Sequence, residues 1–164
     1  MIDFGQSVRM RSWVVVLCLA ISFVSIVDRD LWTPDEPRDA AIALEMSRTG
    51  RVIVPHLAGE PFAEKPPIYY IGAVGFLNLL GTLVGNVGAI RISTAVWGIG
   101  VLLMTFLLAR RLFGRVVAIP AVVILATTEG FVENMHWIRI DAALAFFVIA
   151  ALWAFAETYF GGRR

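Results

Sequence analysis

Residues 89–109 read AIRISTAVWGIGVLLMTFLLA, an apolar run in which Arg91 is the only charged side chain. About 20 such residues are enough for a helix to cross the hydrocarbon core of a membrane. The whole chain has the same character, because 59% of its 164 residues are hydrophobic and 16% are charged. A soluble domain usually carries about a quarter charged residues. The sequence therefore predicts an all-α integral membrane protein.

Three more apolar runs are long enough to cross a membrane, at 11–27, 116–132 and 142–159. A fifth run, 66–84, is ambiguous, because it begins with two prolines and contains three glycines and an asparagine. This run either crosses as a fifth span or lies flat at the interface as an amphipathic helix with one wet face.

The basic residues distinguish these two topologies. The turn 110–115 holds three arginines, and basic residues in short loops favour the cytoplasmic side of a membrane. Only a flat segment 66–84 places this turn on the same side as the basic residues of both chain ends. We therefore expect about four transmembrane helices, with both termini inside and an outer loop over 28–88 that carries surface helices.

The amino end resembles a signal peptide, because Arg9 and Arg11 precede the first apolar run. Residues 22–30 contain no convincing small-x-small cleavage site, so we expect an uncleaved signal anchor. Charge and cysteine content exclude two other classes. The net charge of +1 and the lack of a basic run argue against nucleic-acid binding. A single cysteine, Cys18, excludes an intrachain disulfide.

The outer loop begins with a helix signal, the letters TPDE at 33–36. Thr33 suits the N-cap, Pro34 suits the first helical position, and Glu36 follows the cap by three residues, as in a capping box. The helix is expected to continue through 40–47 and to stop at the glycine that follows at position 50.

Asp35 and Glu36 are the first candidates for chemistry. One interpretation is structural, because acidic residues in the first turn compensate the helix dipole. The other is functional: a carboxylate at the membrane surface can act as a general base toward an acceptor hydroxyl. An adjacent acidic pair alone does not separate the two.

Lys65 follows Glu64 and precedes two prolines. It either extends its ammonium group to the interface as a long amphipathic side chain, or it binds a phosphate at headgroup level together with Arg38. Arg91 is a third cation, able to pair with a loop carboxylate or with a lipid phosphate. The sequence leaves these alternatives open.

Asp141 stands at the start of the last apolar run, where an ionisable residue is a functional candidate and also a good N-cap. The four-span topology places Asp141 on the same outer face as Asp35 and Glu36. The two histidines, His56 and His136, are isolated from each other, so a histidine metal site is not expected.

Taken together, these residues resemble the amino-terminal part of the C-type, polyprenyl-phosphate-dependent glycosyltransferases, the superfamily of aminoarabinose (lipid A) transferases and protein O-mannosyltransferases. The matching stretches are WTPDEPRDA at 32–40, MSRTGRVIVPHL at 46–57, FAEKPPIYY at 62–70, ARRLFG at 109–114 and RIDAALAFF at 139–147. The resemblance implies a partial GT-C fold in a multi-pass membrane protein, with the bacterial inner membrane as the expected location and a periplasmic or extracellular active face.

The resemblance also implies roles for single residues. Asp35 corresponds to the catalytic carboxylate, with Glu36 completing the acidic pair and Asp141 as an acidic residue of the second outer loop. Arg38 and Lys65 match positions near the carrier phosphate. Arg91 is kept as a further phosphate-binding candidate, and Glu64 matches a position where a carboxylate helps to hold a divalent metal cation. The implied partners are a polyprenyl-phosphate sugar donor, a lipid or protein acceptor and membrane lipids.

Members of this superfamily carry many more spans than four. We therefore expect the chain to be the amino-terminal part of a longer enzyme that transfers a sugar at the outer membrane face. The alternative is a non-catalytic membrane binding or assembly protein that recognises lipid phosphate.

Overall fold

The computed structural model describes residues 26–27, 29–32 and 34–161. In chain order its elements are α2 (Asp35–Thr49), β1 (His56–Leu57), β2 (Glu60–Pro61), α3 (Ile68–Phe113), α4 (Arg115–Thr127), α5 (Glu129–His136) and α6 (Asp141–Gly161). Helices dominate, in agreement with the predicted all-α class. The predicted signal anchor and the predicted N-cap Thr33 lie outside the described residues, as does nearly all of the first predicted span.

Helix α2 confirms the helix predicted after the TPDE signal. It begins at Asp35, with Pro34 as the flanking N-cap residue at φ −66°, so the proline precedes the helix instead of occupying its first position. The helix ends where Gly50 adopts a left-handed conformation at φ 68°, and the amide of Gly50 donates to the Met46 carbonyl at 3.0 Å. A glycine takes this conformation without a Cβ clash.

A short hairpin follows α2. Strands β1 and β2 pair antiparallel, with His56 opposite Pro61 and Leu57 opposite Glu60. Ala58 and Gly59, at φ 54° and 86°, form a two-residue loop, which matches the twist of hairpin strands. Sequence analysis missed this hairpin, because strands of two residues show no alternating pattern.

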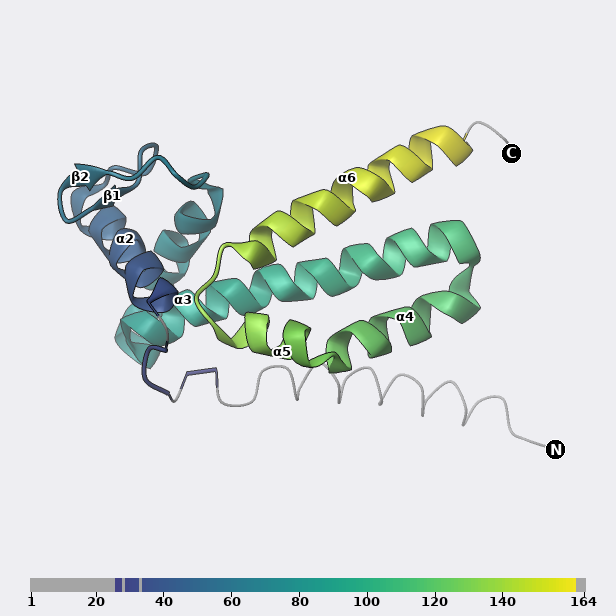
Figure 1. The fold of residues 1–164 in the computed structure, drawn as a ribbon, viewed down its shortest axis with the longest axis horizontal. Helices are drawn as coiled ribbons and strands as arrows, with labels where there is room; N and C mark the ends of the chain where they lie inside the picture. The colour runs from purple at the N-terminus through teal and green to yellow at the C-terminus, as the bar shows by residue number, and fades with distance from the viewer. Residues whose placement is uncertain (1–25, 28, 33, 162–164) are drawn as a thin grey trace.

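Helix α3 is broken in two at Gly85, whose φ of 76° and ψ of 162° are not helical. This backbone region is open to glycine and strained for other residues. The first part, 68–84, packs against α2, and the second part, 86–113, turns away from it (Figure 1). The break therefore separates the ambiguous segment from the predicted second span, although residues 85–88 had been assigned to the outer loop.

The two parts of α3 differ in reach. At 1.5 Å per residue, 86–113 is about 42 Å long and 68–84 about 25 Å, whereas the hydrocarbon core is about 30 Å thick. The second part runs beside α4 and α6, and the turn at Gly114 lies at the end of these helices remote from α2 (Figure 1). If this part crosses the membrane, the arginine-rich turn and α2 lie on opposite sides.

The run 116–132 does not form the single straight helix that was expected. Helix α4 ends at Thr127, Thr128 is extended at φ −71° and ψ 128°, and α5 continues at an angle of 63°. Thirteen residues in α4 are too few for a straight crossing. Together α4 and α5 have the length and composition of a broken span.

Helices α3 and α6 are each long and apolar enough to cross a membrane. Within the described residues there are thus two candidate spanning helices, or three when α4 and α5 are taken as one broken span. Helix α6 covers the predicted run 142–159 and extends it at both ends.

The core that positions the polar cluster lies between α2, the first part of α3 and the start of α6. Its buried side chains are Ala40, Ile42, Ala43, Met46, Tyr69, Tyr70, Ala73, Val74, Leu77, Ala89, Ile90, Ile138 and Ala143. Because α2 buries one face here, the side chains of its first turns are held at fixed positions against α3.

Candidate functional site

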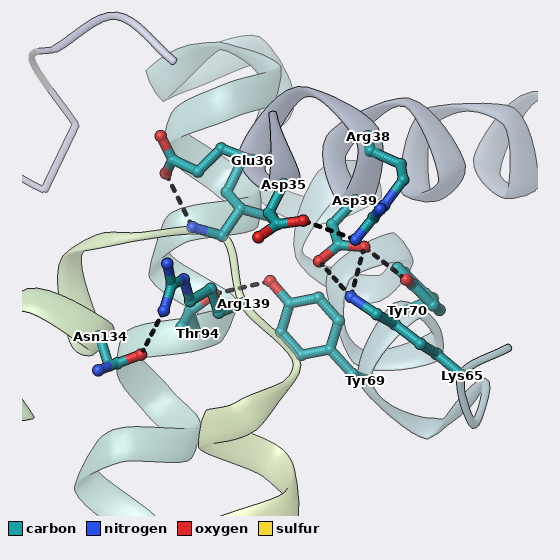
Figure 2. Close-up of polar contacts among 11 residues, drawn as sticks. Asp35, Glu36, Arg38, Asp39, Lys65, Tyr69, Tyr70, Thr94, Asn134 and Arg139 are labelled. Atoms are coloured by element: carbon teal, nitrogen blue, oxygen red, sulfur yellow. Dashed lines mark hydrogen bonds and ion pairs between the residues drawn. The ribbon is translucent and has the colours of Figure 1, made fainter. Parts of the chain in front are cut away.

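The first turns of α2 meet α3 and the loop 137–140 in a cluster of polar side chains (Figure 2). Four stretches of sequence contribute to it, at 35–39, 65–70, 94 and 134–139. Its labelled members are Asp35, Glu36, Arg38, Asp39, Lys65, Tyr69, Tyr70, Thr94, Asn134 and Arg139.

At its centre, Glu36 and Arg91 form an ion pair with no exposed surface. Arg91 donates from Nε to Glu36 Oε1 at 3.2 Å and from Nη2 to Oε2 at 3.1 Å, a two-point contact. The backbone amides of Trp32 and Ile138 donate to the same carboxylate at 2.7 and 2.8 Å. Glu36 therefore accepts four hydrogen bonds, which is about the capacity of a carboxylate.

Arg91 also holds the segment that precedes α2. Its Nη1 and Nη2 donate to the carbonyls of Arg29 and Asp30 at 2.5 and 2.9 Å. The Glu36–Arg91 pair thereby joins four parts of the chain: residues 29–32, α2, the second part of α3 and the loop 137–140. We call this arrangement the buried clasp.

The surroundings of Glu36 act on its pKa in opposite directions. Burial disfavours the charged form and raises the pKa, whereas the hydrogen bonds from Arg91, Trp32 and Ile138 and the charge of Arg91 lower it. The interactions that favour the charged form are stronger in sum, so the pKa of Glu36 lies below its ordinary value of 4.5.

The buried clasp changes how two predicted site residues are interpreted. Glu36 was expected in a catalytic acidic pair and Arg91 at a phosphate. In this structure both side chains are fully enclosed and bonded to each other, so neither is exposed at the protein surface. Their position fits the structural alternative, in which Arg91 pairs with a loop carboxylate.

Asp35 has a different environment from its neighbour Glu36. Its side chain is 45% exposed and accepts a hydrogen bond from Arg38 Nη2 at 2.7 Å, while Arg38 itself is 34% exposed. The guanidinium of Arg38 also lies 5.9 Å from the ring centre of Phe62. Asp35 and Arg38 thus present an accessible carboxylate and an accessible cation from adjacent turns of α2.

Lys65 joins this face of α2 through Asp39. Its Nζ lies 3.4 and 3.3 Å from the two carboxylate oxygens of Asp39, and the Tyr70 hydroxyl donates to Asp39 Oδ1 at 2.7 Å. Asp39 was missed by the sequence analysis. The available signal was its spacing of four from Asp35, which places both on one side of a helix.

Asp141 and Glu64 are exposed, and neither makes a side-chain hydrogen bond or ion pair with the described residues. Asp141 follows Ile138 by three residues, and the bond from Ile138 to Glu36 brings this loop to the start of α2. The described residues contain no group of three histidine, cysteine, aspartate or glutamate side chains able to hold a metal ion. The metal site expected at Glu64 therefore has no ligand set in this part of the chain.

Arg139 is a second residue that the sequence analysis did not select. Its guanidinium stacks 4.3 Å from the ring centre of Trp137, and Nη1 donates to Asn134 Oδ1 at 3.3 Å. Its buried Nε has no hydrogen-bond partner among the described residues. Figure 2 shows this side chain between Glu36 and Tyr69, so a further cation lies at the cluster.

Comparison with known proteins identifies a matching family and several relatives. The model of the dolichyl-phosphate-mannose-protein mannosyltransferase family matches residues 7–164. An undecaprenyl phosphate-alpha-4-amino-4-deoxy-L-arabinose arabinosyl transferase of Edwardsiella ictaluri is 31% identical over 152 residues, 90% of this chain and 27% of the relative. Its namesake in Pseudomonas paraeruginosa is 30% identical over 167 residues, 95% of this chain and 29% of the relative.

An uncharacterized protein of Aquifex aeolicus is similarly related, with 29% identity over 92% of this chain and 30% of the relative. No solved structure matches the chain significantly. The chain thus spans less than a third of the length of these curated relatives. The match over nearly all of its residues confirms the resemblance to polyprenyl-phosphate-dependent glycosyltransferases, and the chain belongs to the dolichyl-phosphate-mannose-protein mannosyltransferase family.

Proposed function

We propose that this chain takes part in the transfer of a sugar from a polyprenyl-phosphate carrier to a lipid or protein acceptor at the outer face of the membrane. One structural observation carries the proposal. An accessible carboxylate, Asp35, lies on the same helix face as the partly exposed cation Arg38 and as Asp39, which holds Lys65. The names of the relatives support a polyprenyl-phosphate donor.

Each accessible group has a role in this proposal. Lys65 and Arg38 meet the negative charge that develops on the carrier phosphate as it leaves, which is where fixed charges contribute most to catalysis. Asp35 contacts the acceptor. Asp141, which begins α6 directly after the loop held to α2 by Ile138, is a second acidic group at the same end of the molecule.

The bond changes follow from an inverting displacement. An acceptor oxygen forms a bond to the anomeric carbon while the bond from that carbon to the phosphate oxygen breaks, and the carrier phosphate departs with the electron pair. When the acceptor is a hydroxyl, its proton passes to Asp35. When the acceptor is an ionised phosphate, no proton moves, and Asp35 only orients it.

The buried clasp holds the backbone of the site in a fixed position. Glu36 follows Asp35 directly, so a fixed Glu36 fixes the first turn of α2. Through the amide of Ile138, the same carboxylate fixes the loop that leads to Asp141. The clasp therefore acts on the reaction by positioning.

A non-catalytic phosphate-binding module is the second candidate. It is favoured by the short contact of 2.7 Å between Asp35 and Arg38, because a carboxylate bonded in this way serves to orient the cation. In that case Lys65 and Arg38 bind lipid phosphate and Asp35 only orients Arg38.

Transfer of labelled sugar separates the two candidates. The protein, as its gene encodes it, is expressed in membranes and supplied with undecaprenyl-phosphate sugar donors. Asp35→Asn is expected to reduce turnover by about 100-fold or more, in the range of general-base removal, without loss of membrane-inserted protein. Unchanged turnover would remove Asp35 from the mechanism. Carrier binding without transfer by the unsubstituted protein would support the binding module.

A further inference from the structure

We propose that Asp39 is a positioning residue for the carrier phosphate: its buried carboxylate holds the Lys65 ammonium on the face of α2 that carries Asp35 and Arg38. The inference rests on the proposed function, in which Lys65 contacts that phosphate. It assigns a role to a residue that is neither exposed nor part of the acidic pair.

The difference in burial between the two partners is the first argument. Asp39 is 1% exposed, whereas Lys65 is 24% exposed. A buried charge is costly unless it is paired and hydrogen-bonded, so Asp39 needs Lys65 and has no access to a ligand of its own. Lys65 is anchored at the carboxylate and still reaches the surface.

The second argument is the way in which Asp39 is itself held. The Tyr70 hydroxyl donates to Asp39 Oδ1 at 2.7 Å, beside the contact that Lys65 makes with the same carboxylate (Figure 2). Tyr70 packs edge-on against Tyr69, whose hydroxyl shares a 2.7 Å hydrogen bond with Thr94. Thr94 belongs to the second part of α3, so buried contacts lead from the long helix across the break at Gly85 to Lys65.

The third argument concerns the ammonium group. Its contacts with Asp39, at 3.3 and 3.4 Å, are longer than the distance of about 2.7–2.9 Å that is usual for charge-assisted hydrogen bonds. An ammonium carries three donors, and the side chain of Lys65 makes no other hydrogen bond with the described residues. Asp39 thus holds the Lys65 ammonium group in position while leaving it with hydrogen-bond donors for a phosphate.

The experiment measures the dissociation constant of undecaprenyl phosphate for the full protein in lipid nanodiscs. Lys65→Gln should weaken binding about tenfold or more, as expected for loss of a charged hydrogen bond. Asp39→Asn should weaken binding about three- to tenfold, a typical coupling between contacting residues. It should have no further effect in a Lys65→Gln background.

The sign of the Asp39→Asn effect is decisive. Removing a negative charge near a phosphate site should tighten phosphate binding, because a Coulomb repulsion is lost. Weaker binding therefore indicates that Lys65 is no longer held in position. Glu45→Gln is the matched control, because it removes one negative charge from the same helix and should leave binding unchanged. Tyr70→Phe keeps both charges and should weaken binding to a smaller extent, which provides the test if Asp39→Asn does not fold.

The outcomes separate this inference from the proposed function. If Lys65→Gln leaves the dissociation constant unchanged, the phosphate role of Lys65 and the inference both fail. If Lys65→Gln weakens binding but Asp39→Asn tightens it, leaves it unchanged, or acts equally in the Lys65→Gln background, only the inference fails.

Discussion

Two adjacent carboxylates, Asp35 and Glu36, show how strongly the surroundings of a residue decide its role. Both stand in the first turn of α2. Glu36 points into the protein and is fully bonded within the buried clasp, whereas Asp35 is 45% exposed. In the sequence the two residues form an adjacent acidic pair. In the tertiary structure Glu36 is a positioning group, and Asp35 is accessible.

Glu36→Gln is expected to destabilise the fold by about 3–5 kcal/mol, because it leaves Arg91 as a buried charge without its counter-ion. Unfolding in mild detergent measures the free energy of unfolding. Asp35→Asn is the matched control and should cost about 1 kcal/mol or less, since both partners of the Asp35–Arg38 pair are partly exposed. Equal losses for the two variants would contradict the buried clasp.

The lowered pKa of Glu36 also predicts a pH dependence. A group whose pKa is lower in the folded state stabilises the fold above its unfolded pKa, and this contribution is lost as the pH falls through the folded pKa. Stability should therefore decrease below about pH 4.5, the ordinary value for this side chain. Urea unfolding between pH 3 and 7 tests this. Glu36→Gln should reduce the decrease in the free energy of unfolding at low pH. If the free energy of unfolding decreases equally at low pH in both proteins, other carboxylates are responsible for the decrease.

At the scale of the elements, the packing of α3 against its neighbours depends on small residues. A Cβ added at Gly98 would lie 1.7 Å from Met135 Sδ on α5, so the Met135 side chain or the two helices would have to shift. Met135 is buried. The glycine therefore permits the contact by which α5 closes against the second part of α3.

Gly98→Ala is expected to destabilise the protein by about 1–3 kcal/mol through overpacking. Gly75→Ala is the control, because a Cβ at Gly75 meets nothing within 4 Å and alanine favours a helix over glycine by about 1 kcal/mol. Thermal unfolding of both variants gives the comparison. Met135→Ala should suppress much of the Gly98→Ala loss, and an additive double variant would argue against this contact.

At the scale of the whole molecule, the polar cluster and the arginine-rich turn lie at opposite ends of the long helices (Figure 1). The break at Gly85 makes this possible, because it folds 68–84 back against α2 and leaves 86–113 as the part long enough to cross. We therefore propose that α2 lies outside and that Arg115 faces the cytoplasm.

Cysteine labelling tests this topology in a Cys18→Ser background. A cysteine replacing Glu60, exposed in the hairpin, should react with an impermeant thiol reagent in intact cells. A cysteine replacing Arg115, exposed at the start of α4, should react only after the membrane is made permeable. Reaction at both positions in intact cells would contradict the proposed arrangement.

Local patterns in the sequence determined much of this protein. The length and low charge of apolar runs predicted helices over 89–109 and 142–159. Helix-capping residues predicted α2 and its end at Gly50. Both kinds of signal depend only on residues that are neighbours in the chain. The ordered motifs identified the family. The break at Thr128 was missed, because the run 116–132 was judged by its length, and length does not reveal a single extended residue inside it.

Only the tertiary structure decided how the charged residues pair. Glu36 meets Arg91 and Ile138, and Asp39 meets Lys65 and Tyr70, across 26 to 102 residues of sequence. No local pattern encodes such contacts, because they form when the apolar faces of α2, α3 and the start of α6 pack together. Burial then makes each pairing strong, since a charge removed from water is stable only beside its partner.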